Sequence, residues 1–368
     1  MGIKVLSLFS GIGAYEKALE RLNVDFEVVN YCEVDKYASK AYSLIHGVPE
    51  EKNLGDISLV NVDEIQEADL ITWSWPCTSL SFAGHKEGFI DKDGNVTASG
   101  LFFEGLRIIK AKKPKIAICE NVKGLVSERF KKEFGIVISS LRQIGYKSYY
   151  AVLNSKDYGV PQNRERVFIV SVREDVDEGF TFPKPLNTDI RLKDILLDED
   201  KVDKKFYLSE KALAGKIAHK ERHKDKGNGF GFQLKSDDDI ASTILARYYK
   251  DGGECLIQRK IIQTAQIYPN SGNPEAGRIY DPNGLSPTVT TCNGGNRMPK
   301  VELGEGIRRL TPLECFRLFG FDDEDCEILT VNGISNTRQY KMAGNSIVVN
   351  VLEEIFKSLT EQYPTVFS

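Results

Sequence analysis

Short apolar runs alternate with helix-like segments through the first half of the chain. Six runs have the length and composition of buried strands, and they lie at residues 3–9, 26–32, 68–74, 115–119, 149–153 and 166–172. Between them, apolar residues recur at helical spacing around residues 14–22, 37–45, 102–110 and 130–144. Strands that alternate with helices predict an α/β fold with a mostly parallel, doubly wound sheet.

The pattern changes near residue 183. Pro183 and Pro185 mark a predicted boundary. Residues 194–300 are richer in glycine, asparagine and charge and contain short strand-like runs, so we expect a second, irregular and mostly β region there. The tail over residues 338–356 returns to an apolar pattern and is expected to rejoin the sheet domain.

Polar or glycine-rich motifs directly follow four of the predicted strands. In chain order they are SGIG (residues 10–13), Glu33, Pro76-Cys77 and Glu120-Asn121. The carboxyl ends of parallel strands meet at one edge of a sheet, and ligands of doubly wound folds bind beyond that edge. The sequence therefore predicts a single site there.

Composition narrows the class of protein. The 368 residues suffice for about two domains, and there is no apolar stretch of about 18 residues that predicts a membrane span. The N-terminus lacks a signal-peptide cleavage site and the seven cysteines have no paired spacing, so we expect a cytoplasmic protein without a disulfide framework. The four histidines do not cluster with cysteines, which argues against a zinc site, and we expect no bound metal.

Charge alone leaves the partner open. The formal net charge of −4 argues weakly against a nucleic-acid partner. Over residues 201–260, however, 14 lysines and arginines stand against 9 acidic residues, with tyrosine and phenylalanine interleaved. Such a stretch is either a solvated face or a contact surface for phosphates.

The SGIG loop and the acidic residues near it favour a nucleoside-containing ligand. Glycines at a strand-to-helix turn let a ligand approach the backbone, and the helix N-terminus favours negative charge. The dinucleotide pattern G-x-G-x-x-G fails because residue 16 is glutamate. Glu33 could bind both hydroxyls of a ribose or be a solvated turn residue, and Asp56 offers a second acidic group expected near the third strand. Together these features indicate an adenosyl ligand.

Cys77 is either a buried packing residue or a nucleophile. The Ser- and Gly-rich loop that follows gives access to the thiol, and Glu120 is predicted at the tip of a neighbouring strand. Arg164 and Arg166 alternate with Glu165 at the opening of another strand, so a period of two directs both arginines to one side. No histidine stands at a matching strand end, which disfavours an ordinary hydrolase and indicates that the acid acts on the substrate.

A cytosine ring fits this set of groups. A thiolate adds to C6 when N3 is protonated or strongly hydrogen-bonded, and the addition makes C5 nucleophilic. C5 then accepts a methyl group from a sulfonium donor, and loss of the C5 proton with elimination of the thiol restores aromaticity. In this reaction Glu120 would protonate or hydrogen-bond N3, and an arginine would donate a hydrogen bond to O2.

The motifs also occur in the order and spacing of a known family. They are LFSGIGAYEKALE, YCEVDKYA, GDI at residues 55–57, WPCTSLSFAGHKEGF, GLFFEGLRIIKAKKPKIAICENVKGL, LNSKDYGVPQNRERVFIV, RRLTPLECFRLFGF and YKMAGNSIVVNVLEEI. On these motifs the chain resembles the C5-cytosine DNA methyltransferases of bacteria and their phages. The resemblance covers nearly the whole chain outside the variable region.

The resemblance implies a Rossmann-like methyltransferase sheet domain at residues 1–182 and 335–368, and a smaller, mostly β target-recognition domain with its hinge at residues 183–334. It implies that Cys77 is the nucleophile, Glu120 the acid at N3, Arg166 the contact to O2 and Arg164 its supporting partner. The implied methyl donor is S-adenosylmethionine. Its binding positions would be Phe9, Ser10, Gly11, Ile12, Gly13, Glu33, Val34, Asp56, Ile57, Pro76, Asn345 and Ser346.

The implied substrate is a cytosine flipped out of double-stranded DNA. The resemblance further implies a monomer that serves restriction–modification or the protection of phage or host DNA. Two residues depart from the family pattern: Thr78 follows the cysteine where glutamine is usual, and Val34 stands where many members have an aromatic residue.

The sequence leaves three other functions open. An RNA cytosine methyltransferase would use the same fold, and the large region at residues 183–330 favours duplex DNA over it. A catalytically inactive DNA-binding relative is disfavoured by the intact Cys77, Glu120 and Arg166. An NAD oxidoreductase is disfavoured by the broken glycine pattern.

Overall fold

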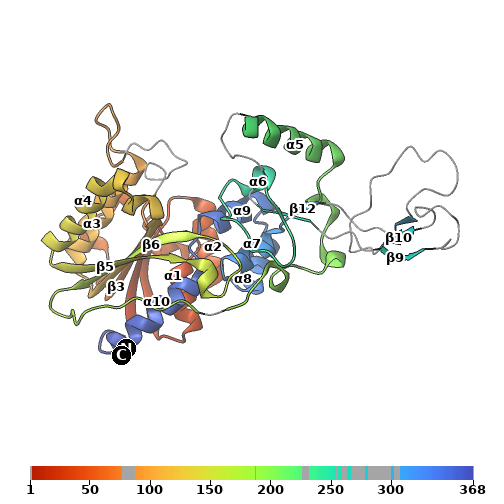
Figure 1. The fold of residues 1–368 in the computed structure, drawn as a ribbon. Coiled ribbons are helices and arrows are strands. Elements are labelled where there is room, and N and C mark those ends of the chain that lie inside the picture. Colours follow the sequence, from red (N-terminus) through yellow and green to blue (C-terminus); the bar gives the residue numbers. More distant parts are fainter. Residues whose placement is uncertain are drawn as a thin grey trace.

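Six strands form one sheet in the order β2-β1-β3-β4-β6-β5 (Figure 1). They are β1 (Ile3–Leu8), β2 (Phe26–Cys32), β3 (Leu70–Trp73), β4 (Ile116–Val122), β5 (Tyr146–Asn154) and β6 (Glu165–Arg173). Each strand corresponds to one of the six apolar runs, so the predicted strands are confirmed. The computed structural model describes residues 2–76, 88–186, 188–225, 232–253, 255–258, 263–266, 278–280, 300–301 and 307–367.

The sheet is mixed, with one strand reversed. β1 pairs in parallel with β2 and β3, and β3 with β4. β6 is antiparallel to both of its neighbours, β4 and β5. The predicted mostly parallel α/β sheet is therefore confirmed with β6 as its exception. Because of this reversal, the start of β6 lies at the same edge as the carboxyl ends of β1 to β4.

The position of Glu120 and Asn121 differs from the expectation. They were expected after a strand, whereas they lie inside β4. β3 pairs with β4 only as far as Ile118, but the antiparallel β6 continues the ladder until Val122 faces Arg166. The apolar run ends earlier than the strand because Glu120 and Asn121, near the end of β4, are polar.

The loop at residues 55–57 is positioned by contacts with β2. Asn53 bridges to Tyr31 of β2, the Cys32 thiol donates to the Gly55 carbonyl at 3.0 Å, and a short 3-10 helix follows at Ile57–Leu59. Ile57 belongs to the same buried cluster as Ile71 of β3. Asp56 therefore reaches the sheet edge from a loop that lies against the end of β2.

Helices cover both faces of the sheet (Figure 1). Neighbouring residues of β4 alternate between two buried clusters: Ile116 and Ile118 belong to one, and Ala117 and Cys119 to the other. The first cluster contains residues of α1 and α10, and the second contains residues of α3 and α4. These helices are α1 (Ala14–Arg21), α3 (Phe102–Lys112), α4 (Lys131–Gln143) and α10 (Val349–Gln362), while α2 (Lys36–His46) follows β2.

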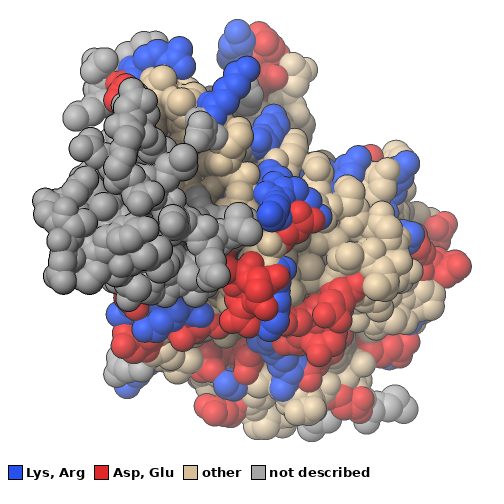
Figure 2. Space-filling model, turned by 90° about the vertical axis from the view of Figure 1, so that its right-hand side faces the viewer, with Lys and Arg blue, Asp and Glu red and all other residues tan. Residues whose placement is uncertain are grey.

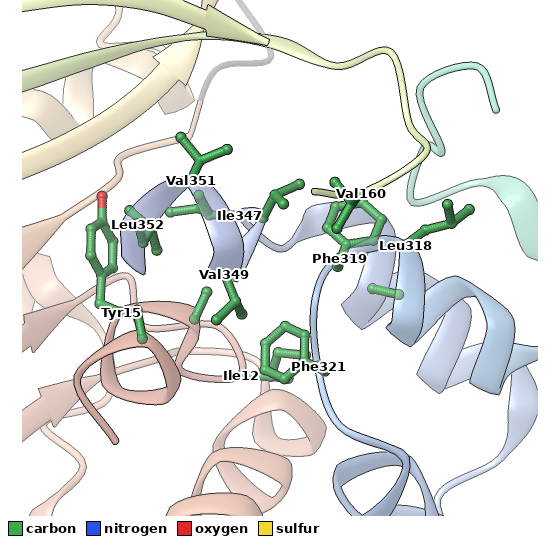
Figure 3. Close-up of a cluster of buried hydrophobic side chains, with 14 of the residues drawn as sticks. Ile12, Tyr15, Val160, Leu318, Phe319, Phe321, Ile347, Val349, Val351 and Leu352 are labelled. Carbon is green, nitrogen blue, oxygen red and sulfur yellow. The ribbon is translucent and has the colours of Figure 1, made fainter. Parts of the chain in front are cut away.

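The tail packs against α1, as its apolar pattern predicts. Figure 3 shows Ile12 and Tyr15 beside Val349 and Leu352 of α10 in one apolar cluster. Ion pairs extend this contact to helix α8 (Asp323–Val331), where Lys17 lies 2.7 Å from Asp325. The contact crosses the domain boundary expected at residue 335, and that boundary stays a prediction.

The second region contains short helices and strands. In the described residues its helices are α5 (Glu210–Asp225), α6 (Tyr248–Asp251), α7 (Pro312–Leu318) and α8, and α9 (Asn336–Asn345) follows directly after it. Its strands are β7 (Leu234–Lys235), β8 (Leu256–Ile257), β9 (Gln263–Gln266), β10 (Arg278–Tyr280), β11 (Lys300–Val301) and β12 (Arg308–Arg309), which form two three-stranded sheets. No helix within the described ranges is long and apolar enough to cross a membrane.

A buried ion pair connects β12 to the start of α7. The Arg308 guanidinium donates two hydrogen bonds of 2.9 Å to the Glu314 carboxylate, and both side chains are almost fully buried. Glu314 also accepts hydrogen bonds from the backbone N–H groups of Thr311 and Leu197. Because Thr311 caps α7 in return, one carboxylate holds the helix start, the strand and a distant loop together.

Candidate active site

A cavity of about 600 Å³ lies at the edge of the sheet where β1, β2 and β4 end. Its volume is in the range of small-molecule sites. Most residues predicted for the methyl donor line it, namely Phe9, Ser10, Gly11, Ile12, Glu33, Val34, Asp56, Ile57, Pro76, Asn345 and Ser346. Glu120 lines the same cavity, so the structure brings the predicted donor positions and the predicted acid together.

The SGIG loop forms one wall of this cavity through unusual backbone angles. Phe9, Gly11 and Gly13 have φ values of 54°, 57° and 79°. A Cβ added at Gly11 would meet no protein atom within 4 Å, so it would stand in open space beside the cavity. A Cβ at Gly13 would lie 2.1 Å from Nε2 of His46. Glycine at residue 13 is therefore required by packing as well as by φ.

Glu33 is held at the end of β2 by backbone donors. Its Oε2 accepts a hydrogen bond from the Gly11 N–H at 3.0 Å, and its Oε1 accepts one from the Asp35 N–H at 2.7 Å. Burial raises the pKa of this carboxyl, while these hydrogen bonds oppose the shift. Each oxygen keeps further acceptor capacity, so Glu33 is preorganised to accept hydroxyl groups from a ligand.

The rim of the cavity is more exposed. Val34 is 75% exposed. Asp56 is exposed as well, and hydrogen bonds from Ser58 lower the pKa of its carboxyl. From the other side, Nζ of Lys341 on α9 pairs with Asp35 at 2.6 Å, which brings the tail to the cavity.

Glu120, which lines the cavity, forms an ion pair with Arg166. The Nε of Arg166 lies 2.9 Å from Oε1 of Glu120, and both side chains are largely buried. The two residues come from adjacent strands, and they meet because β6 starts where β4 ends. A carboxylate with a guanidinium partner in a shielded site can hold and orient a polar ring edge.

Arg164 links the start of β6 to two other segments. Its guanidinium donates hydrogen bonds to the carbonyl groups of Ile244, at 3.2 Å, and Ser346, at 2.9 Å. It also lies over the Phe319 ring, 4.9 Å from the centroid. These contacts support the cavity wall at Ser346, and a contact of Arg164 with the substrate stays a prediction.

Cys77 lies outside the described residues, so its position is not part of the site geometry. The chain up to Pro76 is described, and Pro76 lines the cavity. The Asn121 side chain donates to the Trp75 carbonyl at 3.3 Å, which ties this segment to β4 beside Glu120. The backbone therefore delivers the residue before Cys77 to the same cavity.

Several residues that line the cavity are not among the site positions predicted from the sequence. Tyr15 and Ser74 line the cavity and share a hydrogen bond of 3.0 Å, and Lys341 and Met342 line it from α9. Tyr15 stands two residues after the SGIG loop and Ser74 three residues before Cys77. Their positions within or beside the quoted motifs could have identified them as site residues. Their hydrogen bond across 59 positions could not be predicted from the sequence.

The fold and the site define a class, an α/β protein with a nucleoside-sized cavity beside a buried carboxylate–guanidinium pair. Residues 3–361 match the family described as C-5 cytosine-specific DNA methylase. Orphan methyltransferase M.SPBetaI of Bacillus phage SPbeta is 33% identical over 98% of both chains. Type II methyltransferase M.NlaX of Neisseria lactamica is 33% identical over 97% of this chain and 96% of that protein. The chain belongs to the C-5 cytosine-specific DNA methylase family.

Solved structures agree with the fold. The Entamoeba histolytica methyltransferase EhMeth matches with a TM-score of 0.70 at 17% identity, covering 98% of both chains. The S. pombe Dnmt2 methyltransferase matches with a TM-score of 0.64 at 20% identity and the same coverage. At these identities the likeness concerns the fold alone, and it confirms the expected fold class.

Proposed function

We propose that the protein transfers a methyl group from S-adenosylmethionine to C5 of a cytosine in double-stranded DNA, through a transient bond between Cys77 and C6 of the ring. The observation that carries the proposal is one cavity lined by the SGIG loop, Glu33, Pro76 and Glu120. Family membership supports the reaction class, and the cavity indicates where donor and base would meet.

The cavity residues fit the proposed donor. Glu33 retains acceptor capacity for the two ribose hydroxyls, and Gly11 leaves open space beside the backbone. The exposed Val34 offers an apolar surface that a planar base would cover. Ile57 on the loop wall and Ser346 on the tail would enclose the rest of the molecule. When bound, S-adenosylmethionine supplies an electrophilic methyl group on a sulfonium centre.

The chain's own residues would act on the cytosine. The Cys77 thiolate forms a bond to C6 while Glu120 gives a proton or a strong hydrogen bond to N3, so that the electron pair moves into the ring. Arg166 holds the Glu120 carboxyl in place and can donate to O2. After C5 has been methylated, a base takes the C5 proton and the bond between C6 and the Cys77 sulfur breaks, which regenerates the thiolate.

The DNA partner is supported by the charge of the second region. Figure 2 views the molecule from that side and shows basic side chains toward its top and acidic side chains crowded lower down. α5 lies at the top of Figure 1, and its Lys211, Lys220 and Arg222 are exposed. Lysines and arginines on such a helix suit contacts with phosphates, which position a protein without reading sequence.

The remaining parts of the proposal concern organisation and role. We infer that residues 183–334 carry target recognition, that residues 1–182 and 335–368 form the catalytic unit, and that the protein acts as a monomer in the cytoplasm. The named relatives are orphan and type II methyltransferases, which supports a role in restriction–modification or in the protection of phage or host DNA.

The experiment is methyl transfer from labelled S-adenosylmethionine to duplex DNA, with tRNA as the competing substrate. Label in DNA that maps to C5 of cytosine in bisulfite sequencing is the expected result. Cys77→Ala serves as the control and should transfer no label, while its thermal unfolding stays unchanged. Label found in tRNA and not in DNA would overturn the proposed substrate.

A further inference from the structure

A chain of hydrogen bonds connects the helix after the SGIG loop to the predicted acid. The Glu120 backbone N–H donates to Oγ of Ser74 at 3.0 Å, and the Ser74 hydroxyl pairs with the Tyr15 hydroxyl at 3.0 Å. All three residues line the cavity described above. Tyr15 belongs to α1, Ser74 to the segment between β3 and Cys77, and Glu120 to β4.

Ser74 replaces a missing strand partner. β3 pairs with β4 as far as Ile118 and ends at Trp73, so no β3 residue lies in register with Glu120. An unpaired, largely buried N–H group is costly, and here the Ser74 side chain accepts it. The position of the Glu120 backbone on this side is therefore set by one hydroxyl.

Tyr15 fixes the orientation of that hydroxyl. The tyrosine is only 4% exposed, and Figure 3 shows its ring packed in the apolar cluster with its oxygen pointing away from Leu352 and Val349. Burial raises the pKa of Tyr15 well above its usual value, so the hydroxyl stays protonated and neutral. A hydroxyl that must accept from Glu120 keeps one donor and one acceptor site, and Tyr15 occupies one of them.

We infer that Ser74 and Tyr15 are positioning residues that hold the Glu120 backbone in register with the donor-binding helix, so that the Glu120 carboxyl stays against Arg166. The inference rests on the proposed role of Glu120 in the reaction. It adds a physical link between the wall that would bind the donor and the group that would act on the base. Neither residue touches the reacting atoms in this account.

The test compares kcat and KM for methyl transfer in Ser74→Ala, Ser74→Thr and Tyr15→Phe. Misplacing a catalytic group by a fraction of an ångström lowers kcat, so we expect a fall of about 10- to 100-fold for Ser74→Ala with KM for both substrates within about twofold. Ser74→Thr keeps the hydroxyl and should restore kcat to within about threefold. Tyr15→Phe should lower kcat by a smaller factor, and the double variant should match Ser74→Ala alone.

Thr72→Val is the matched control. Thr72 lies on β3 two residues before Ser74, and its hydroxyl also pairs with a buried hydroxyl, that of Ser7, at 3.1 Å. If Ser74→Ala lowers kcat no more than Thr72→Val, or if Ser74→Ala and Tyr15→Phe add independently, the inference is overturned. If Ser74→Ala fails to fold, the test compares the kcat of Tyr15→Phe with that of Thr72→Val. A kcat of Tyr15→Phe that is no lower than that of Thr72→Val then overturns the inference.

Glu120→Gln separates this inference from the proposed function. If Glu120→Gln keeps normal kcat, the proposed role of Glu120 fails and the inference falls with it. If Glu120→Gln loses activity while Ser74→Ala behaves like Thr72→Val, only the positioning role fails.

Discussion

At the level of single residues, the proposed reaction depends on how Glu120 is held in place. A carboxylate on β4 meets a guanidinium on β6 at 2.9 Å, and a serine hydroxyl holds its backbone from the opposite side. None of these partners is a neighbour in sequence. The chemistry expected of Glu120 thus requires three segments to arrive at one point.

Arg166→Ala should lower kcat by about 100-fold or more, because removing a donor that orients an acid and stabilises charge has that order of effect. The measurement is steady-state methyl transfer at saturating DNA and donor. Arg173→Ala is the matched control, since Arg173 ends the same strand and pairs with the exposed Asp175. Equal kcat values for the two variants would contradict the assignment of Arg166.

His46 predicts a pH dependence of stability. Its Nε2 lies 3.0 Å from the Ile12 carbonyl and its Nδ1 lies 2.6 Å from the Glu20 carboxylate, with Glu16 and the Tyr42 ring also close. Two acceptors favour the doubly protonated ring, and the Glu20 hydrogen bond raises the pKa of His46 despite the opposing effect of burial. The charged ring then holds the carbonyl of the SGIG loop.

A histidine whose folded-state pKa is raised stabilises the fold fully below its unfolded pKa of about 6.5, and this stabilisation is lost as the pH rises through the folded-state pKa. Urea unfolding of the wild type and His46→Gln should therefore differ most near pH 6 and less near pH 9. A difference in unfolding free energy that is the same at both pH values would show that His46 is not charged in the fold.

At the scale of elements, the buried pair of Arg308 and Glu314 anchors α7 and β12. Both side chains are 1% exposed or less, and Glu314→Ala removes two hydrogen bonds from the buried Arg308 guanidinium, which keeps only its weaker pair with Glu199 at 3.2 Å among the described contacts. We expect a loss of about 3–5 kcal/mol in the free energy of unfolding, measured with a chemical denaturant. Lys131→Ala, which removes an exposed pair with Glu128, should cause no measurable change. A loss no larger than that of Lys131→Ala would contradict the structural role.

The sequence predicts the elements well but not every direction or register. Apolar runs locate all six strands of the main sheet, and β2 has the predicted bounds. The reversed direction of β6 has no trace in its apolar pattern, since parallel and antiparallel strands bury the same residues. The pairing of Arg166 with Glu120 follows from that reversal. The position of the loop at residues 55–57 also leaves no trace in the sequence pattern, because a backbone bridge from Asn53 to Tyr31 positions it.

The sequence predicts the site residues that belong to a motif at the end of a strand. It does not predict those that are brought to the site by long-range contacts. The SGIG loop, Glu33 and Pro76 line one cavity, as their positions at strand ends suggest. Tyr15 and Ser74 were missed because their contact depends on how α1 packs over β3. The supporting role of Arg164 stays a prediction, and its hydrogen bonds to the Ile244 and Ser346 carbonyl groups are long-range contacts that the sequence does not indicate.

At the scale of the whole molecule, α5 tests the DNA partner. Replacing Lys211 and Arg222 by glutamine removes two exposed positive charges, and each charge that contacts a phosphate contributes about 0.9 to the slope of log K against log salt. We expect weaker duplex binding and a slope reduced by about 2 in magnitude, measured by fluorescence anisotropy at several salt concentrations. Glutamine at Lys131 and Lys132 on α4 is the control. An unchanged slope in the α5 variant would mean that α5 is a solvated face.

Covalent capture on duplex DNA in which 5-fluorocytosine replaces cytosine tests directly whether Cys77 is the nucleophile. Fluorine at C5 cannot leave as the proton does, so the bond between C6 and the enzyme persists after methyl transfer. We predict a complex that survives denaturation, maps to Cys77 by peptide mass analysis and is absent from Cys77→Ala. A complex that forms equally in Cys77→Ala, or that maps to another residue, would contradict the account.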